Sequence, residues 1–350
     1  MLAVGALVAL VASANAQETL QWGGIALLRA SSFDDPGPLE SDSLSSQVQL
    51  GIDWFPAPRF GAHVHLVGRT EDFDARRGKA GIVEAFVDAT FRPRGDRLRL
   101  RGGAFFLPTS RENVDALWES PYTITPSALN SWLGEEFRPI GIDAAYFRRS
   151  FVAGATLFRG NDTFGALPPV RGWSYRDHWT VLGEWLPVDA EDFTSVSAET
   201  DGRIGWSGRL GWNGQPIALQ VTYLDNRSDG LEYGQLYNWD TRFTIVSAEY
   251  TTNDWTIAAE SGWGPTIIVV PPFRFTSDLE ASYLLISRRL AKGRASLRAD
   301  LVNDGETESD AITLAYLWTA RPRMRAGVEV TAAEGDVRLL VEIRYSFSGR

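Results

Sequence analysis

The chain has 350 residues, a formal net charge of −10 at pH 7 and no cysteine. Its acidic balance argues against a nucleic-acid partner, because the phosphates would be repelled. The lack of cysteine excludes a disulfide framework and a thiolate-ligated metal site, so hydrogen bonds and packing must stabilise the fold.

The first element in the chain is an apolar run from Leu2 to Ala12, followed by Ala14-Asn15-Ala16. An apolar core followed by a small-x-small site is typical of a secretory signal peptide. The Lys or Arg that usually precedes such a core is missing. The alternative, a membrane-spanning helix, needs ~20 apolar residues, and this run has about 12. We therefore expect residues 1–16 to be a signal peptide and residues 17–350 to form a single domain.

From Leu20 to Phe347 the chain consists of segments of about ten residues in which apolar and polar positions alternate. In the last segment every second residue from Val337 to Phe347 is apolar, and Leu340 is the exception on the polar side. Such strands have one apolar and one polar face. Their length matches a tilted membrane strand better than the five or six residues, roughly, of a sandwich strand.

A soluble β-sandwich would also alternate, so two further features decide between the folds. The polar faces carry arginine together with carboxylates, which suits a water-filled lumen. Aromatic residues recur at the ends of the apolar stripes, where the aromatic girdles of membrane barrels lie. They are Trp22, Trp54, Trp212, Trp255, Trp263, Trp318 and Tyr345. We therefore expect an all-β fold, a transmembrane antiparallel β-barrel.

The connections alternate between short turns and longer polar loops, as periplasmic turns and outer loops do in such barrels. The short turns are at 56–58, 93–96, 213–216, 252–254, 291–293 and 320–322, and the longer loops at 31–45, 71–79, 107–138, 225–235, 264–277 and 303–309. Seventeen strands are recognisable, but two termini on the same side require an even number. Either Thr163–Ser174, with Pro168-Pro169, hides an eighteenth strand, or two doubtful segments merge to give 16.

One strand is chemically distinct, because Arg97, Arg99 and Arg101 alternate with apolar residues and share its lumenal face. Residues two apart on a strand are about 6.6 Å apart, and guanidinium groups are permanently charged forks that suit oxyanions. The pattern predicts a wall that can pass an anion from one arginine to the next. The alternative is a structural ion-pair network with Glu84 and Asp88 of the preceding strand.

The longest connection, residues 107–138, follows this strand. Thr125 as N-cap and Pro126 at the first helical position predict a short helix. With Trp118 and Trp132, the loop is too apolar for open solvent, so we expect it to fold into the barrel and narrow it; a surface lid is the alternative. Folding inward would bring a set of charged residues to the opening, namely Arg111, Glu112, Asp115, Glu135, Glu136 and Arg138.

The run from Leu98 to Ser110, with Glu112-Asn113 soon after, resembles the strand and third loop of the phosphate-selective porin (O/P-type) family. The resemblance covers Glu84 to Glu136, and it implies a 16-stranded, usually trimeric barrel in which Arg97, Arg99 and Arg101 form an arginine ladder. Members of that family also attract anions with lysines, whereas this chain has two, Lys79 and Lys292. We therefore expect a more general selectivity.

These observations predict an outer-membrane porin through which small hydrophilic solutes, anionic ones among them, diffuse passively. We expect no cofactor and no catalysis, contact with membrane lipid and lipopolysaccharide, and a homotrimer. The alternatives are a lipase-like outer-membrane enzyme and a structural or adhesin barrel with a closed lumen. The three histidines, His63, His65 and His178, have no serine motif nearby, and His63 with His65 lacks a third metal ligand.

Overall fold

The structure is a computed structural model and describes residues 19–34, 43–70, 79–188, 193–333 and 336–349. The expected signal peptide, residues 1–16, lies outside the described residues. Two α-helices, α2 (Ala128–Glu136) and α3 (Leu167–Arg171), and one 3-10 turn, η1 (Pro93–Gly95), occur in the described part. None of its helices is long and apolar enough to cross a membrane.

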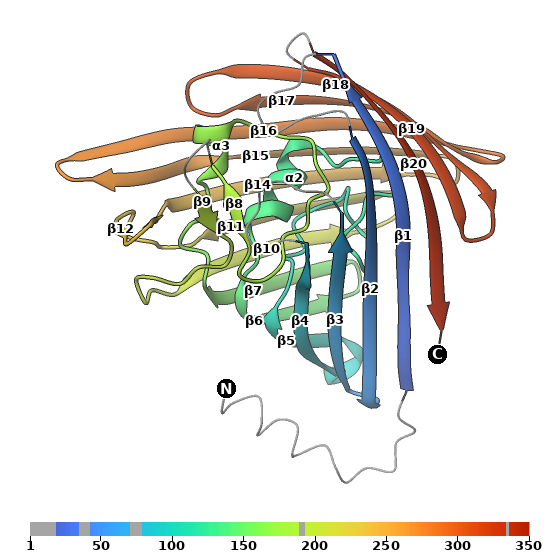
Figure 1. Ribbon diagram of the computed structural model, residues 1–350. Helices are drawn as coiled ribbons and strands as arrows, with labels where there is room; N and C mark the ends of the chain where they lie inside the picture. Colours follow the sequence, from blue (N-terminus) through green and yellow to red (C-terminus); the bar gives the residue numbers. More distant parts are fainter. Residues whose placement is uncertain (1–18, 35–42, 71–78, 189–192, 334–335, 350) are drawn as a thin grey trace.

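Sixteen antiparallel strands form a closed barrel in which each strand pairs with its neighbour in the chain and β1 pairs with β20 (Figure 1). The number of wall strands is even, as it must be when both termini lie on the same side of the membrane. The strands are β1 (Thr19–Phe33), β2 (Ser43–Ala57), β3 (Phe60–Arg69), β4 (Ala80–Phe91), β5 (Arg97–Ala104), β6 (Ile140–Arg148), β7 (Phe151–Arg159), β10 (Gly205–Asn213), β11 (Ile217–Asp225), β14 (Asp240–Thr251), β15 (Trp255–Val270), β16 (Phe273–Leu290), β17 (Gly293–Asn303), β18 (Glu308–Arg321), β19 (Met324–Ala333) and β20 (Asp336–Gly349).

The remaining strands form two small hairpins that are not part of the barrel wall. One joins β8 (Trp185–Pro187) to β9 (Phe193–Ser195), and the other joins β12 (Glu232–Tyr233) to β13 (Leu236–Tyr237). Residues 163–174 do not hide a wall strand, because they contain the short helix α3. Proline cannot donate to a strand ladder but suits the first turn of a helix, where Pro168 and Pro169 lie. The prediction of an eighteenth strand is therefore wrong.

The alternation along each strand places apolar residues outside and polar residues inside. In β20, Leu339, Val341 and Ile343 are exposed, whereas Glu342 and Arg344 are buried in the interior. All seven aromatic residues expected in the girdles lie on the outer surface, with exposed fractions between 37% and 45%. A soluble sandwich would bury the apolar face, so this distribution matches a barrel surrounded by lipid.

The six predicted short turns each connect consecutive strands at one end of the barrel. A further turn, at Arg149-Ser150 between β6 and β7, lacks the glycine and proline that mark turns, although Arg149 has a positive φ of 52°. The expected loop at 264–277 is wrong, because β15 and β16 pair continuously up to Val270 and Phe273. Their hairpin projects beyond its neighbours (Figure 1).

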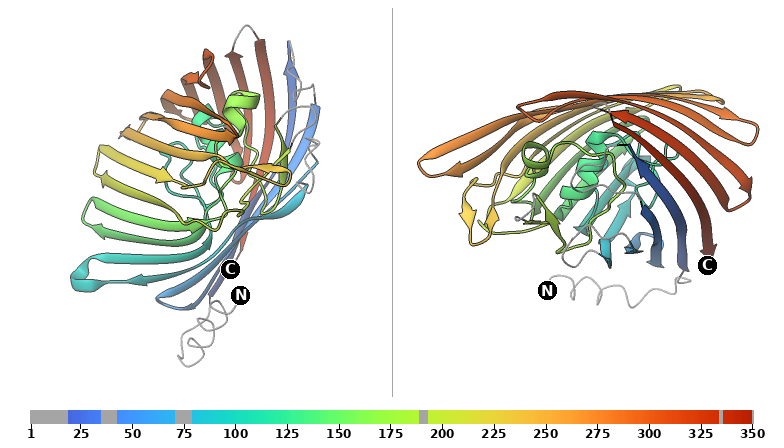
Figure 2. Two further views of the ribbon diagram at one scale, coloured as in Figure 1. Left: turned by 90° about the vertical axis from the view of Figure 1, so that its left-hand side faces the viewer. Right: turned by 45° about the horizontal axis from the view of Figure 1, so that its top comes forward.

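Two long loops occupy the inside of the barrel (Figure 2). We call residues 105–139, between β5 and β6, L3, and residues 160–204, between β7 and β10, L4. Every residue of helix α2 in L3 is buried. The prediction that the third loop folds into the lumen is confirmed, and a role as a surface lid is excluded.

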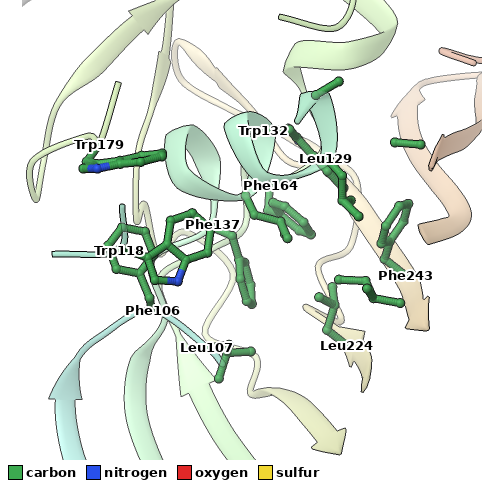
Figure 3. Close-up of a cluster of buried hydrophobic side chains, with 14 of the residues drawn as sticks. Phe106, Leu107, Trp118, Leu129, Trp132, Phe137, Phe164, Trp179, Leu224 and Phe243 are labelled. Carbon is green, nitrogen blue, oxygen red and sulfur yellow. The ribbon is translucent and has the colours of Figure 1, made fainter. Parts of the chain in front are cut away.

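An apolar core joins L3 and L4 to the inner wall (Figure 3). Trp132 of α2 stacks on Phe164 of L4 at 4.6 Å between ring centroids and meets Phe243 of β14 at 4.9 Å. Phe106 and Trp118 of L3 stack at 4.2 Å with nearly parallel rings. Aromatic side chains bury about 150–250 Å² each, so these contacts provide much of the free energy that keeps both loops folded inside.

Candidate functional site

A cavity of about 520 Å³ lies between the inner face of β5 and the first half of L3. Its lining includes Arg97, Phe147, Val152 and Asn213, which all lie beside the short turns. Ten residues of L3 between Phe106 and Trp118 line it as well. The cavity is therefore the part of the lumen that faces the short-turn end, and L3 separates it from the apolar core.

The predicted arginine ladder lines this cavity with all three members, Arg97, Arg99 and Arg101. Arg101 lies 3.9 Å from Asp143 of β6, to which Arg209 of β10 is bound by two hydrogen bonds of 2.6 and 3.1 Å. Asp143 is fully buried and also accepts a 2.8 Å hydrogen bond from Thr156. It thus neutralises part of the ladder, and this residue was missed by the sequence analysis.

Glu84 and Asp88 form no close ion pair with the ladder, but Asp88 attracts Arg99 and Arg101, and Glu84 attracts Arg101, from a longer distance. In the described chain, no nitrogen of the ladder lies within 4.0 Å of either carboxylate. Glu84 lines the cavity but accepts a 2.6 Å hydrogen bond from the backbone of Phe106 and lies 3.8 Å from His65. Asp88 is opposite Arg101 in the register of β4 and β5. Glu84 therefore fixes the start of L3.

In the part of the chain that the structure describes, no carboxylate lies within 4.0 Å of Arg97 or Arg99. Their guanidinium carbons lie 3.9 and 5.9 Å from the ring centroid of Phe147 on the adjacent strand β6. A ring face attracts a cation without neutralising it. Asp143 and Asp88 attract Arg99 only from beyond 4.0 Å, so two positive charges at the cavity wall lack a close anion.

Of the six charged residues predicted at the opening, Arg111 and Asp115 line the cavity. The Arg111 guanidinium donates a 2.7 Å hydrogen bond to Asn213, at the end of β10, and its backbone N–H donates to Glu260 of β15. Asp115 accepts hydrogen bonds from the backbone N–H groups of Leu117 and Glu119 at 2.9 and 3.0 Å. Both side chains therefore fix the loop while they face the cavity.

The other four residues, Glu112, Glu135, Glu136 and Arg138, are buried and attach L3 to its surroundings. Glu112 lies 3.1 Å from Arg298 of β17 and accepts a 2.8 Å hydrogen bond from the backbone of Ser127. Ser127, and not Thr125 as predicted, is the N-cap of α2. The Thr125 hydroxyl donates instead to Glu329 of the wall, which explains the shift of the cap.

Glu135, Glu136 and Arg138 face L4 or the interior of L3. Glu135 forms an ion pair with Arg171, and Glu136 accepts hydrogen bonds from the backbone of residues 165–167. Arg138 lies 3.3 Å above the ring of Phe106 and donates to the carbonyl of Gly134 at 2.9 Å. Burial lowers the pKa of Arg138 to about 9, so its charge is kept at neutral pH. L3 and L4 thus form one connected unit.

Two ion pairs attach this unit to the wall formed by β20 and β1. Glu119 of L3 accepts a 2.9 Å hydrogen bond from Arg344, and Asp177 of L4 accepts bonds of 2.6 and 2.7 Å from Arg29. Burial favours the uncharged form of Asp177, but the attraction of Arg29 keeps the pKa of Asp177 below its ordinary value. The sequence analysis missed both pairs, since they join residues more than 140 positions apart.

The three histidines are bound to polar neighbours at separate places. His63 lies 2.8 Å from Asp53, His65 lies 2.7 Å from Gln49, and His178 lies 2.7 Å from Glu184. Only His63 lines the cavity. A histidine beside a carboxylate is one part of a hydrolytic triad, but it needs a nucleophile as well.

The group that could hold a metal ion lies in L4 and not at the histidines. Oxygens of Asp162, Glu199 and Asp201 lie within 4.8 Å of one another. Asp162 accepts a 2.6 Å hydrogen bond from the backbone of Thr200, and Glu199 lies 3.1 Å from Arg159. These local partners already compensate the negative charge, so the cluster is explained as a loop brace.

No protein-family model and no curated protein sequence matches the chain. Among solved structures it is similar to in-vitro folded OmpT, an outer membrane protein of Vibrio cholerae in its trimer form, with a TM-score of 0.62, 11% identity and coverage of 94% of this chain and 99% of that one. It is also similar to Salmonella typhi OmpF in complex with daunomycin (TM-score 0.59, 10% identity, 94% and 97% covered).

A mutant of the Rh. blastica porin is similar as well, with a TM-score of 0.52, 11% identity and coverage of 95% of this chain and 100% of that one. At such identities the likeness concerns the fold, which is that of outer-membrane porin barrels. The resemblance to the phosphate-selective family stays a prediction.

Proposed function

We propose that the chain is an outer-membrane porin through which small hydrophilic solutes diffuse passively, with a preference for anions. The observation that carries this proposal is the charged cavity inside a barrel whose outer face is apolar and girdled by aromatic residues. Charged side chains that line an interior are typical of a water-filled passage. L3 is the element that narrows it.

The preference for anions follows from the balance of charge around the cavity. Five arginines and three carboxylates line it, so the wall is net positive although the whole chain has a charge of −10. Arg97 and Arg99 contribute most, because they have no carboxylate partner among the described residues. A positive wall with low-dielectric surroundings raises the local concentration of anions.

We also propose that the mature chain is exported by residues 1–16 and assembles as a homotrimer in contact with lipid and lipopolysaccharide. The trimer form printed for the Vibrio cholerae protein supports this assembly. Chemical cross-linking of the detergent-solubilised protein tests it, because a trimer gives a band at three times the monomer mass.

Conductance across a planar lipid bilayer tests the porin function. The purified chain is expected to give stepwise currents. Under a KCl gradient, its reversal potential should show a higher permeability to chloride than to potassium. Cation selectivity would contradict the anion preference. If immunodetection shows inserted protein but no current flows, the structural barrel with a closed lumen is favoured. The apolar core of L3 and L4 inside the lumen is the observation that supports that alternative.

A further inference from the structure

We infer that the cavity at the short-turn end binds organic monoanions that join one carboxylate to an apolar body, such as an aromatic acid, in preference to small inorganic anions. This inference rests on the proposed function, since it names the solute class of the same lumen. It follows from two properties of the lining, which lie on different elements and face the same space.

The first property is a pair of arginines without a close carboxylate, beside two arginines that share one. Arg101 and Arg209 share Asp143, whereas Arg97 and Arg99 have no ion-pair partner within the described ranges. The Arg99 Nε–H is buried and has no hydrogen-bond acceptor. A carboxylate with two oxygens suits such forked donors.

The second property is the amount of apolar surface around these cations. Nine of the 22 lining residues are apolar. They come from three sources: Phe86 of β4, Phe147 and Val152 of β6 and β7, and L3 between Phe106 and Trp118. An apolar body that leaves water for this surface gains free energy in proportion to its buried area.

The size and charge of the cavity also favour this class. Its volume of about 520 Å³ lies in the ~300–1,000 Å³ range of sites for small organic molecules. Inorganic phosphate gains nothing from apolar walls and must lose strongly bound water. Asp53 and Asp115, which also line the cavity, would repel its higher charge more than that of a monoanion.

Isothermal titration calorimetry on the detergent-solubilised barrel tests the inference without relying on conduction. The probes are benzoate, acetate and inorganic phosphate, each as its sodium salt at constant ionic strength. We expect benzoate to bind at least about tenfold more tightly than acetate, because its ring buries apolar area that acetate lacks. Equal affinities for benzoate and acetate, or tighter binding of phosphate, would overturn the inference.

Variants identify the site. Arg99→Gln is expected to weaken benzoate binding about tenfold, since a charge-assisted hydrogen bond is lost. Val114→Ser removes apolar contact from a side chain that is 55% exposed, so the fold is retained; it should weaken benzoate about two- to threefold and leave acetate unchanged. Arg148→Gln, at the same end but outside the cavity, is the matched control and should change neither.

Heat-modified mobility in gel electrophoresis verifies that each variant is a closed barrel. An Arg99→Gln barrel that is folded and binds benzoate as tightly as the parent chain would overturn the inference. Binding that depends on Arg99 and Val114 in a barrel without conductance would overturn the porin function and leave the site standing. A conducting barrel in which chloride current is unaffected by millimolar benzoate would overturn the site alone.

Discussion

Two kinds of arginine line the cavity, and the difference between them lies in their partners. Arg101 is close to Asp143, donates to the carbonyl of Phe106 at 3.2 Å and lies 3.9 Å from the ring centroid of Phe105. Arg99 has no carboxylate within 4.0 Å in the described chain, and its guanidinium carbon lies 5.9 Å from the ring centroid of Phe147. The first arginine therefore stabilises the structure, whereas the charge of the second is available to a solute.

This difference predicts unequal effects of two similar substitutions. Arg99→Ala should lower the chloride-to-potassium permeability ratio several-fold, while Arg101→Ala should change it less but lower the urea midpoint of unfolding more. Reversal potentials in a KCl gradient and urea titrations of the same preparations provide the two readouts. Arg148→Ala is the control for both. The reverse order of the two selectivity effects would contradict the assignment.

Asp143 offers the complementary substitution, since its carboxylate compensates Arg209 and part of the charge of Arg101. Asp143→Asn leaves two buried guanidinium groups without an anion, and breaking one side of a buried ion pair costs about 3–5 kcal/mol. We expect less stable barrels that prefer chloride more strongly. The denaturant midpoint and the reversal potential measure the two effects, and an unchanged reversal potential would show that this carboxylate does not screen the ladder.

At this scale the sequence predicts one face of a strand well and its partners poorly. Alternation along a single strand is enough to place Arg97, Arg99 and Arg101 on the lumenal side. The proximity of Asp143 to Arg101 depends on the register between β5 and β6, which are separated by 35 residues of L3. The alternation of residues along one strand does not determine its register with a strand that follows so much later in the chain.

L3 and L4 are the elements that determine how much of the lumen is filled. Their aromatic contacts and the hydrogen bonds from residues 165–167 to Glu136 connect them, and the ion pairs of Glu119 and Asp177 attach them to the wall. Both ion pairs are buried, so removing either carboxylate leaves an arginine of the wall without one of its anions and weakens the attachment of that loop.

The attachment of L4 should depend on pH. Asp177 has a folded-state pKa below its ordinary value of about 4, so its stabilising contribution is complete above that pH and is lost as the pH falls toward the lower value. Amide protection factors of L4, measured by hydrogen exchange at pH 7 and pH 3, should fall on acidification. At pH 3, about one unit below the ordinary pKa, the expected loss is at most about tenfold, because the full loss is reached only below the folded-state pKa.

Asp177→Asn tests the same attachment at neutral pH. The amide cannot form an ion pair with Arg29, so L4 protection should already be low at pH 7 and should fall less at pH 3 than in the parent chain. Glu184 supplies the remaining pH dependence. Burial raises its pKa, but His178 and Arg69 outweigh burial and keep the pKa of Glu184 below its ordinary value. Equal pH responses in both proteins would show that Asp177 does not hold the loop.

Among the elements, β15 and the short elements of L4 could not be predicted fully from the alternation of apolar and polar residues. Long alternating segments predicted strands at the right places. The outer half of β15 was hidden by Gly264, which has a φ of 156°, and by the apolar run Ile267–Val270. Gly264 lies too close to the backbone of Arg242 to accept a side chain. In L4, helix α3 and the β8–β9 hairpin are too short for any periodicity, and they exist because the barrel interior packs around them.

On the scale of the whole molecule, the apolar surfaces are divided between two places. One faces outward all around the barrel, and the other is the core that L3 and L4 form within the lumen. The sequence predicts the first from alternation alone. It predicts the second only as an inward-folded L3, since the partners Phe158, Leu224 and Phe243 lie on lumenal positions that alternation would assign to polar residues.

This division makes the two ends of the lumen unequal. The apolar core surrounds α2 (Figure 3). The charged cavity lies beside the short turns. A bulky reagent that arrives from the loop end must displace packed aromatic side chains, and one from the turn end needs only to enter an aqueous space. Access to the cavity should therefore be asymmetric, whatever the selectivity of the passage.

The absence of cysteine allows this asymmetry to be measured with single introduced thiols. Val114→Cys puts a thiol at the cavity, and Tyr237→Cys puts one on the outer hairpin β12–β13, where the parent side chain is 40% exposed. A maleimide coupled to a polymer too large for the lumen, added to intact cells, should label Cys at 237 at least about tenfold faster than Cys at 114, because the polymer cannot pass the core of L3 and L4 to reach the cavity. After detergent extraction both ends are open to the reagent, and the rates should converge. Equal labelling on intact cells would mean that the core of L3 and L4 does not separate the cavity from the outside, and the proposed constriction would have to lie elsewhere.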